Sequence, residues 1–426
     1  MIDLLTIGIV SSFLSPPHLV REYLQRFGIG PNHLVLDPFC GTGTTIVECT
    51  KLGIPSIGIE ANPMAHFATQ VKSDWSPDPD GLLKHGREVA EVAQAKIETE
   101  GIEDDISLPL FDTCKRSLIY KNHVLRTLPP EKQKLLLTNS ISPLPLHKTL
   151  VLLEYLNEYR DQRYYNHELL ALAKALVYSI SNLHFGPEVG VGAAKPDVPV
   201  VPTWVNVVQT MANDLRILEV LQSPTPRVYL ADSRQIAHVV APSTVDAVIT
   251  SPPYPNEKDY TRTTRLEAVL LGFIQSSADL RALKRDLVRS NTRGVYKGDD
   301  DDQWIRQNTK IQRIAKAIEK RRIKLGKTSG FERLYHKVTK LYFGGMARHL
   351  ADLRAVLKPG ARLAYVVGDQ ASYLRVMIRT GQLLAEIAQS LGYELIAIDL
   401  FRTRLATATK EQLREEVVVL RWPGQR

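Results

Sequence analysis

The feature that most constrains the fold is a short segment near the N-terminal end, in which two apolar runs flank a glycine-rich turn and a helical stretch. Residues 34–37 form the first run, Thr44–Leu52 has the composition of a helix, and Ser56–Glu60 forms the second run. A strand, a tight turn, a helix and a second strand in this order are typical of the opening of a doubly wound α/β sheet. We therefore expect a sheet of this class at the centre of the fold.

Short, β-rich runs resume only in the second half of the chain. Two helical patterns lie between them, Met346–Leu357, which Lys358-Pro-Gly360 would end as a turn, and Gly381–Leu391. The later predicted strands are Arg227–Leu230, Val245–Thr250, Arg362–Val367, Leu395–Leu400 and Glu416–Leu420.

A long segment, Asp74–Pro226, interrupts this α/β pattern. It begins with the linker-like Ser76–Asp80, contains a Gly/Pro/Val loop over Gly186–Pro202, and is otherwise mostly helical. The predicted helices are Gly86–Thr99, Leu146–Gln162, His167–Asn182 and Thr203–Leu221.

A second interruption, residues 276–340, is basic. It holds 18 of the chain's 54 Lys and Arg residues but only 8 of its 46 Asp and Glu residues, so the whole basic excess lies there. DNA or RNA would be attracted to such a segment mainly through phosphate contacts, although a solvated helical surface would have the same composition. A long helix is predicted over Gln303–Ile323, and Asp299–Asp302 precede it, where negative charge favours a helix start.

Several classes of protein are disfavoured by composition. No apolar run approaches the ~20 residues that a membrane span needs, and Met1–Leu14 is apolar without the basic start and cleavage site of a signal peptide. Cys40, Cys49 and Cys114 are too few for a disulfide framework and are not spaced as metal ligands. We expect an intracellular, cytoplasmic protein with no metal site.

The turn after the first predicted strand is Asp37-Pro-Phe-Cys-Gly-Thr-Gly-Thr-Thr45. Gly41 and Gly43 permit a tight turn and a close approach of the backbone to a ligand. The turn lacks the Gly-Lys-Ser/Thr of a phosphate loop and the third glycine of the dinucleotide fingerprint. Asp37 suits a ligand with an ammonium and a carboxylate group, and Glu60 can accept hydrogen bonds from both hydroxyls of a ribose.

A second motif, Ser251-Pro-Pro-Tyr254, follows the predicted strand Val245–Thr250 and so projects from the edge where such sheets bind ligands. Its prolines offer carbonyl acceptors without N–H donors. Tyr254 could stack on an exposed base while the Pro252 carbonyl and the Ser251 hydroxyl accept from its amino group. Taken alone, the tetrapeptide fits a packed proline turn equally well.

Together, these two motifs resemble motifs I and IV of the amino-directed DNA methyltransferases, which modify cytosine N4 or adenine N6. The resemblance covers residues 10–72, 227–270 and 342–424. Four other stretches resemble the family more weakly. Phe13–Val20 resembles its cofactor lid, and Ala231–Ser233 resembles its adenine-contacting loop. Val366–Asp369 resembles the end of its fifth strand, and Leu400–Thr403 with Glu416–Leu420 resembles its closing hairpin.

The resemblance implies a Rossmann-like, S-adenosylmethionine-dependent sheet with a flipped-out base as substrate. The implied cofactor-binding residues are Asp37, Phe39, Gly41, Gly43, Glu60 and Asp232. The implied catalytic residues are Ser251, Pro252, Pro253 and Tyr254. The residues that follow them and could reach the base or a phosphate are Asn256, Asp259, Tyr260 and Arg262.

It also implies a division of the chain into a core and two insertions. The expected parts are 1–73 (cofactor-binding part of the core), 74–226 (mostly helical insertion and possible target-recognition region), 227–275 (catalytic part of the core), 276–341 (basic insertion for nucleic-acid contact) and 342–426 (end of the core).

Serine at the first position of motif IV is commoner among cytosine-N4 enzymes and aspartate among adenine-N6 enzymes, so Ser251 favours cytosine N4 in DNA. Methylation at cytosine C5 would need a cysteine near Ser251, and none is there. An RNA base amino-methyltransferase stays open. So does a nucleic-acid-binding protein on a degenerate scaffold, although the intact motifs argue against decay. The family also suggests a restriction or defence-system partner.

Overall fold

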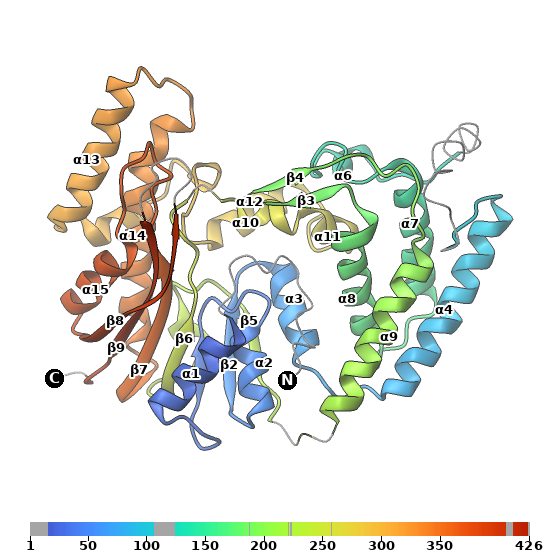
Figure 1. The fold of residues 1–426 in the computed structure, drawn as a ribbon, viewed down its shortest axis with the longest axis horizontal. Coiled ribbons are helices and arrows are strands. Elements are labelled where there is room, and N and C mark those ends of the chain that lie inside the picture. The colour runs from blue at the N-terminus through green and yellow to red at the C-terminus, as the bar shows by residue number, and fades with distance from the viewer. Residues whose placement is uncertain are drawn as a thin grey trace. The chain divides into compact units, whose positions relative to one another are not determined.

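The computed structural model describes residues 16–105, 124–186, 188–219, 221, 224–256, 258–405 and 412–424 (Figure 1). Phe13–Ser15 of the predicted cofactor lid, the apolar start of the chain and Cys114 lie outside these residues. The chain divides into two compact units. We call them the helical unit, with Gln70–Gln222 and Thr261–Leu280, and the sheet unit, with Phe13–Thr69, Ser223–Tyr260 and Arg281–Arg426. Among the described residues, no helix is long and apolar enough to cross a membrane.

In the described part of the sheet unit, seven strands form one sheet in the order β5-β2-β1-β6-β7-β9-β8. Neighbouring strands from β5 to β7 pair in parallel, whereas β9 is antiparallel to both β7 and β8. The expected α/β sheet and its closing hairpin are confirmed. The strands are β1 (Val35–Asp37), β2 (Ser56–Glu60), β5 (Arg227–Leu230), β6 (Val245–Thr250), β7 (Leu357–Gly368), β8 (Glu394–Leu405) and β9 (Gln412–Arg421).

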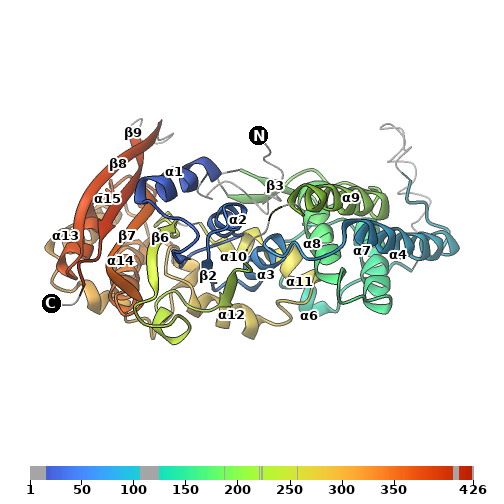
Figure 2. The same cartoon turned by 90° about the horizontal axis from the view of Figure 1, so that it is seen from below.

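Helices cover both faces of this sheet (Figure 2). Strand side chains alternate between the faces, so Leu36 and Val248 join the core formed with α14 and α15, whereas Val35 and Ala247 pack with α1. The helices with residues in this unit are α1 (Pro17–Phe27), α2 (Thr44–Lys51), α3 (Pro63–Lys72), α10 (Tyr260–Thr263), α12 (Ser277–Asp286), α13 (Thr309–Lys324), α14 (Tyr335–Leu353) and α15 (Thr380–Ser390).

The helical unit packs around α9, whose buried Trp204 donates from Nε1 to the Glu168 carbonyl of α8 at 2.9 Å. A Cβ placed on Gly86 of α4 would lie 3.0 Å from Val208, so α4 approaches α9 closely there. The other elements of this unit are α4 (Pro79–Thr99), α6 (Pro130–Gln133), α7 (Pro143–Glu158), α8 (Tyr165–Ala175), α9 (Val201–Leu218), α11 (Arg265–Leu270) and the hairpin of β3 (Leu183–Phe185) and β4 (Val189–Val191).

Three boundaries predicted for the helical unit were wrong. Ser76–Asp80 is not a linker, because Asp78 caps α4 by accepting from the Gly81 amide and Pro79 occupies the first helical position. The predicted helix His167–Asn182 ends as an α-helix at Ala175 and continues as one π turn to Ile180. The predicted loop Gly186–Pro202 contains β4.

Two helix predictions in the sheet unit also need correction. The predicted helix Gln303–Ile323 is not continuous. A 3₁₀ segment, Asp301–Ile305, comes first, and α13 follows, capped by Asn308, which accepts from the Ile311 amide. Asp299–Asp302 therefore do not lie at an α-helix start. The predicted helix Met346–Leu357 covers the second half of α14 but runs past its end at Leu353. Lys358-Pro-Gly360 lies inside β7, which begins at Leu357.

Candidate active site

The two sequence motifs meet at one edge of the sheet. β1 and β6 are parallel neighbours, so the turn after Asp37 and the tetrapeptide after Thr250 leave the sheet side by side. Thr250 donates from its hydroxyl to Oδ1 of Asp37 at 2.7 Å, although the two residues are 213 positions apart. This bond joins the last residue of each strand, which places both motifs at the ligand-binding edge of an α/β sheet.

Asp37 is a buried carboxylate without a cationic partner among the described residues. Besides Thr250, its Oδ1 accepts from the Phe39 amide at 3.1 Å. Burial raises the pKa of Asp37 to about 6, and the hydrogen bonds from Thr250, Thr45 and Phe39 offset only part of that rise. Such a carboxylate would gain from a cationic group brought to it.

Glu60 ends β2 and holds the glycine turn. Its Oε2 accepts from the Gly41 amide at 2.9 Å and its Oε1 accepts from the Asn62 amide at 2.8 Å. Burial raises the pKa of Glu60 to about 7 in spite of these donors. Each carboxylate oxygen keeps further acceptor capacity, so two hydroxyl donors can still be accommodated.

The glycine turn is left-handed at two positions, Gly41 with φ 53° and Gly43 with φ 88°. A Cβ on Gly43 would lie 2.7 Å from Cγ2 of Thr69, so glycine at this position lets Thr69 pack against the turn. The amino end of α2 has no side-chain cap. The Thr42 hydroxyl is buried and has no hydrogen-bond partner among the described residues. The turn therefore has polar groups to offer to a small anionic group.

The Ser251–Tyr254 tetrapeptide packs against the end of β7. Ser251 donates from Oγ to the Val366 carbonyl at 3.4 Å. The ring of Tyr254 is only 4% exposed, and a Cβ on Gly368 would lie 3.1 Å from its Cε2. The sequence predicts a ring that could stack on an exposed base, or else a packed proline turn. The structure covers Tyr254, so a stacked base would require it to be uncovered.

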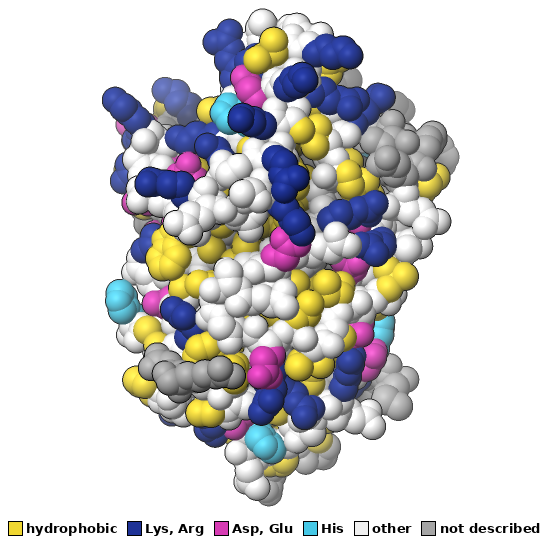
Figure 3. All heavy atoms as spheres, turned by 90° about the vertical axis from the view of Figure 1, so that its left-hand side faces the viewer, with side chains coloured by type: hydrophobic (Ala, Val, Ile, Leu, Met, Phe, Trp, Pro, Cys, Tyr) yellow, Lys and Arg dark blue, Asp and Glu magenta, His cyan; other side chains and the backbone are white. Residues whose placement is uncertain are grey.

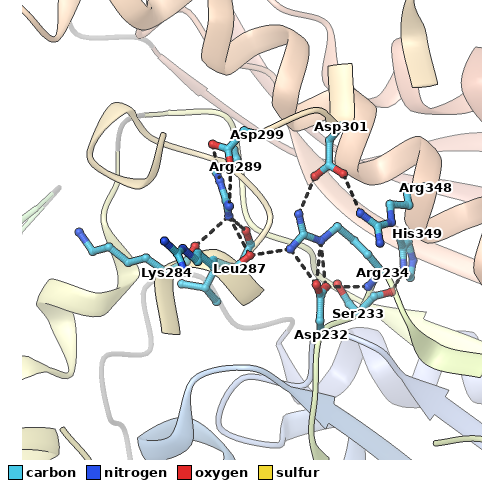
Figure 4. A network of polar contacts seen from close by, with 11 residues as sticks. Asp232, Ser233, Arg234, Lys284, Leu287, Arg289, Asp299, Asp301, Arg348 and His349 are labelled. Atoms are coloured by element: carbon cyan, nitrogen blue, oxygen red, sulfur yellow. Dashed lines mark hydrogen bonds and ion pairs between the residues drawn. The ribbon is translucent and has the colours of Figure 1, made fainter. Parts of the chain in front are cut away.

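The loop after β5 carries Asp232, whose two carboxylate oxygens accept from Arg234 at 2.7–3.0 Å (Figure 4). Ser233 of the same loop accepts through its carbonyl from His349 Nδ1 at 2.8 Å. His349 also contacts the Tyr365 hydroxyl at 2.6 Å, and burial lowers its pKa to about 4, so this histidine is neutral. The ring of Phe39 lies edge-on to His349 at 4.9 Å between centroids.

Sequence reasoning missed Arg234 and His349. Arg234 directly follows the predicted loop Ala231–Ser233, but its second partner, Asp301, is 67 positions away. His349 lies in no recognisable motif, and its partner Ser233 is 116 positions away. Sequence reasoning also proposed four residues beyond Tyr254. Of these, Asp259 is buried in an ion pair with Lys284 at 2.9 Å, which gives it a structural role. Asn256 accepts from the Lys258 amide, and Tyr260 accepts weakly from the Tyr254 amide at 3.5 Å. Arg262 belongs to the helical unit.

A third of the 18 Lys and Arg residues of the basic segment form ion pairs within the described chain. The pairs are Lys284–Asp259, Arg289–Asp299, Lys310–Glu386, Arg322–Glu319, Lys327–Glu332 and Lys340–Asp302. The outer side of α13 differs. Arg313, Lys316, Lys320 and Lys324 are exposed, lie three or four residues apart, and form no ion pair within the described chain. We call these four residues the α13 stripe; Figure 3 shows Lys and Arg side chains gathered over this part of the unit.

Comparison with known proteins gives matches of one kind. A family model described as DNA methylase (N6_N4_Mtase) matches residues 15–70. Type II methyltransferase M.BsoBI of Geobacillus stearothermophilus is 26% identical over 426 residues, which cover 95% of this chain and 81% of the relative. Type II methyltransferase M.AvaI of Anabaena variabilis is 29% identical over 192 residues, 42% of this chain and 38% of the relative.

Among solved structures, the crystal structure of TrmN from Thermus thermophilus aligns with 99% of this chain and 52% of that chain, at 12% identity and a TM-score of 0.32. A likeness at that score supports no inference about function.

Proposed function

Since the chain belongs to the amino-directed DNA methyltransferase family and is a DNA methyltransferase enzyme, we propose that it transfers the methyl group of S-adenosylmethionine to cytosine N4 in DNA. The observation that supports this most directly is the hydrogen bond from Thr250 to Asp37. It sets the candidate cofactor turn beside the candidate acceptor motif, as a direct transfer between two bound groups requires.

The residues at the edge fit the chemical groups of S-adenosylmethionine. The desolvated carboxylate of Asp37 suits the ammonium, and the uncapped start of α2 with the partnerless Thr42 hydroxyl suits the carboxylate. Glu60 would accept from the ribose hydroxyls. The remaining proposed cofactor-binding residues are Phe39, Gly41, Gly43 and Asp232. When bound, the cofactor supplies a methyl group on a positively charged sulfur.

Ser251 and Pro252 would orient the amino group that takes the methyl. The Pro252 carbonyl has no competing N–H on its own residue. Because Ser251 donates its proton to the Val366 carbonyl, its oxygen would keep its lone pairs for accepting a hydrogen bond. Hydrogen bonds to both would draw the nitrogen lone pair out of conjugation with the ring. Serine is too weak a base to take the proton, which would leave to solvent as the N–C bond forms and the S–C bond breaks.

Tyr254 and Pro253 complete the proposed acceptor site. A flipped base would stack on the Tyr254 ring, and stacking of this kind contributes about 1–3 kcal/mol per base. That gain would offset the few kcal/mol that unpairing and unstacking cost. Since the ring is 4% exposed, part of the gain would also be spent on uncovering it.

For DNA contact we propose the α13 stripe. Residues three or four apart on a helix lie about 5–6 Å apart, which is comparable to the spacing of successive phosphates on one strand. Contacts of this kind position a duplex without reading its sequence. Residues 276–341 would thus hold the backbone, and the helical insertion 74–226 stays a candidate for target recognition.

The test is to incubate the protein with methyl-labelled S-adenosylmethionine and either unmethylated genomic DNA or total RNA, and to identify labelled nucleosides by mass spectrometry. We expect label in N4-methyldeoxycytidine, reduced at least tenfold in Tyr254→Ala and retained in Tyr254→Phe, which keeps an aromatic ring. Label in N6-methyldeoxyadenosine would overturn the choice of base. Label confined to RNA would overturn the substrate class. A wild-type protein that binds no cofactor would overturn the proposal as a whole.

A further inference from the structure

A buried chain of ion pairs joins the loop after β5 to α14 (Figure 4). Arg234 binds both oxygens of Asp232, with Nε at 2.9 Å from Oδ1 and Nη2 at 2.7 Å from Oδ2. The same guanidinium donates from Nη1 to Asp301 Oδ2 at 2.5 Å, and Arg348 donates to Asp301 Oδ1 at 3.3 Å. Only 7% of the Arg234 side chain and 5% of the Asp301 side chain are exposed. The guanidinium of Arg234 thus links Asp232, a candidate cofactor residue, to Asp301 of the basic segment.

The backbone of Asp301 is fixed as firmly as its side chain. A Cβ on Gly344 of α14 would lie 2.0 Å from the Asp301 carbonyl oxygen, and one on Gly345 would lie 3.3 Å from Asp301 Oδ2. The 3₁₀ segment that starts at Asp301 therefore rests directly on α14, at a place where only glycine fits. A side chain at Gly344 would have to displace the main chain of Asp301, and one at Gly345 would require the Asp301 carboxylate to shift by a few tenths of an ångström.

Arg234 also holds the other end of the same stretch. Its Nη2 donates to the Arg285 carbonyl, near the end of α12, at 2.7 Å. One side chain thereby fixes both Arg285 and Asp301, and α13 begins eight residues after Asp301. Arg234 therefore helps to position the segment that leads into α13, together with Arg348 and the packing of Asp301 on Gly344.

The cost of burying these charges indicates what they do. Ion pairs removed from water stabilise a fold little compared with apolar residues of the same volume, but they impose a geometry, and loss of one partner leaves a charge without compensation. Removing Arg234 would leave Asp232 and one oxygen of Asp301 in that condition. Both carboxylates would then be driven to new positions near water.

We propose that Arg234 is a positioning residue that couples the binding of S-adenosylmethionine at Asp232 to the binding of DNA at the α13 stripe. This inference rests on the proposed function. Cofactor contact would fix the Asp232 carboxylate, which fixes Arg234 and, through Asp301, the segment that leads into α13. Because coupling between two sites is reciprocal, DNA would raise cofactor affinity by the same factor.

The test measures the dissociation constant for sheared, unmethylated genomic DNA with and without saturating S-adenosylhomocysteine, a cofactor product that cannot transfer methyl groups. In the wild type we expect at least fivefold tighter DNA binding with the cofactor product. In Arg234→Gln the ratio should fall to about one. Arg234→Lys should give an intermediate ratio, since a lysine keeps the charge but cannot bind Asp232 with two nitrogens.

Arg289→Gln is the matched control. It breaks a neighbouring pair of the same segment, Arg289–Asp299, with 4% and 10% of the two side chains exposed. It also removes a donor to the Arg285 carbonyl, as the Arg234 variants do, but it does not touch Asp232. It should keep the wild-type ratio. A ratio of one in the wild type, or a wild-type ratio in both Arg234 variants, would overturn the coupling. If Arg234→Gln does not fold, the lysine variant decides. A wild type that binds neither ligand would instead overturn the proposed function.

Discussion

Two regions of the sheet unit are rich in carboxylates and use them in opposite ways. At the strand ends, Asp37 and Glu60 accept only from neutral hydroxyl and amide donors, and burial raises the pKa of each. In the basic segment, Asp299, Asp301 and Asp302 each lie within ion-pair distance of Lys or Arg. Buried carboxylates without cations indicate a ligand site, whereas paired ones hold structure.

The same contrast applies to the cations. The net charge of residues 276–340 suggests a continuous basic surface. However, six of its Lys and Arg residues form ion pairs, and Arg234 and Arg348 both pair with Asp301. The α13 stripe is exposed on one side of its helix and forms no ion pair within the described chain. Perturbations of the strand ends should therefore change catalysis and cofactor binding, and perturbations of the stripe should change DNA binding with a dependence on salt.

The largest effect is expected from Lys316→Ala, Lys320→Ala and Lys324→Ala combined. Each lost phosphate contact lowers the slope of log K against log salt by about 0.9, so the slope should fall by roughly 3 and DNA affinity near 0.1 M salt by about 100-fold. Fluorescence anisotropy across a salt series measures both. Cofactor affinity should not change.

The control for the stripe removes the same charge from paired positions. Lys310→Ala, Arg322→Ala and Lys327→Ala combined take three cations out of ion pairs with Glu386, Glu319 and Glu332. If this variant loses as much slope as the stripe variant, net charge matters and the exposed stripe does not.

The sequence could predict the strand ends because their chemistry is local. Gly41, Gly43 and Glu60 fall within one strand–turn–helix–strand unit, and the positions of β1, α2 and β2 follow from it to within a residue or two. The meeting of that unit with Ser251–Tyr254 follows from the rule that parallel strands share a carboxyl edge. The cover over the Tyr254 ring could not be predicted, because it depends on Gly368, more than 100 residues later in the chain.

The basic segment could be predicted in composition but not in structure. Gly344 and Gly345 interrupt a helical pattern in sequence, so the first half of α14 was missed, yet they are what allows Asp301 to lie on that helix. The four aspartates suggested a helix start, whereas the structure shows Asp299 and Asp301 bound to Arg289, Arg234 and Arg348. Partners so distant in sequence leave no local signal.

A second prediction tests whether the strand ends act on catalysis. Ser251→Ala removes one acceptor for the base amino group and should lower kcat about 30-fold, which corresponds to about 2 kcal/mol, the cost of leaving one hydrogen-bonding group unpaired. KM for DNA should change little. Ser251→Asp keeps an acceptor and should retain more activity than alanine. Steady-state methylation assays over a range of DNA concentrations measure kcat and KM, and an unchanged kcat in the alanine variant would remove Ser251 from the catalytic site.

A third prediction concerns pH and cofactor binding. Glu60, with a pKa of about 7, must be ionised to accept from two hydroxyls, so affinity for S-adenosylhomocysteine should rise about tenfold from pH 6 to pH 8. Asp37, with a pKa of about 6, adds to this rise at the acidic end. Calorimetric titrations at several pH values measure it. Glu60→Gln should bind more weakly and lose most of the dependence, and an unaltered pH profile in that variant would contradict the assignment.

The carboxyls of Asp37 and Glu60 also determine the direction in which the stability of the folded protein changes with pH. Both keep their protons to a higher pH when folded than when unfolded, so their contribution favours the folded state most at acidic pH and is lost as pH rises from about 4 towards 7. The free protein should thus lose stability over the range in which it gains cofactor affinity. Saturating cofactor should reduce that loss, because Asp37 would then face an ammonium.

The smallest effect, and the sharpest comparison, comes from Gly368→Ala. The added Cβ would lie 3.1 Å from Tyr254 Cε2 and 3.4 Å from Glu415 Cγ, so the tyrosine ring must shift by a few tenths of an ångström. A shift of that size in a covered stacking ring should lower kcat about fivefold, which corresponds to about 1 kcal/mol. Gly360→Ala on the same strand, where a Cβ would meet nothing within 4 Å, controls for glycine loss, although its φ of 89° adds strain.

The strand ends should govern catalysis, and the α13 stripe should govern DNA binding. This division would be wrong if Gly368→Ala lowered DNA affinity and its salt slope but left kcat intact. A lower kcat with an unchanged slope would instead place the effect at the strand ends alone. The melting temperature of each variant shows whether the change is confined to the ring. A general loss of packing would make the melting temperature of Gly368→Ala lower than that of the strained Gly360→Ala.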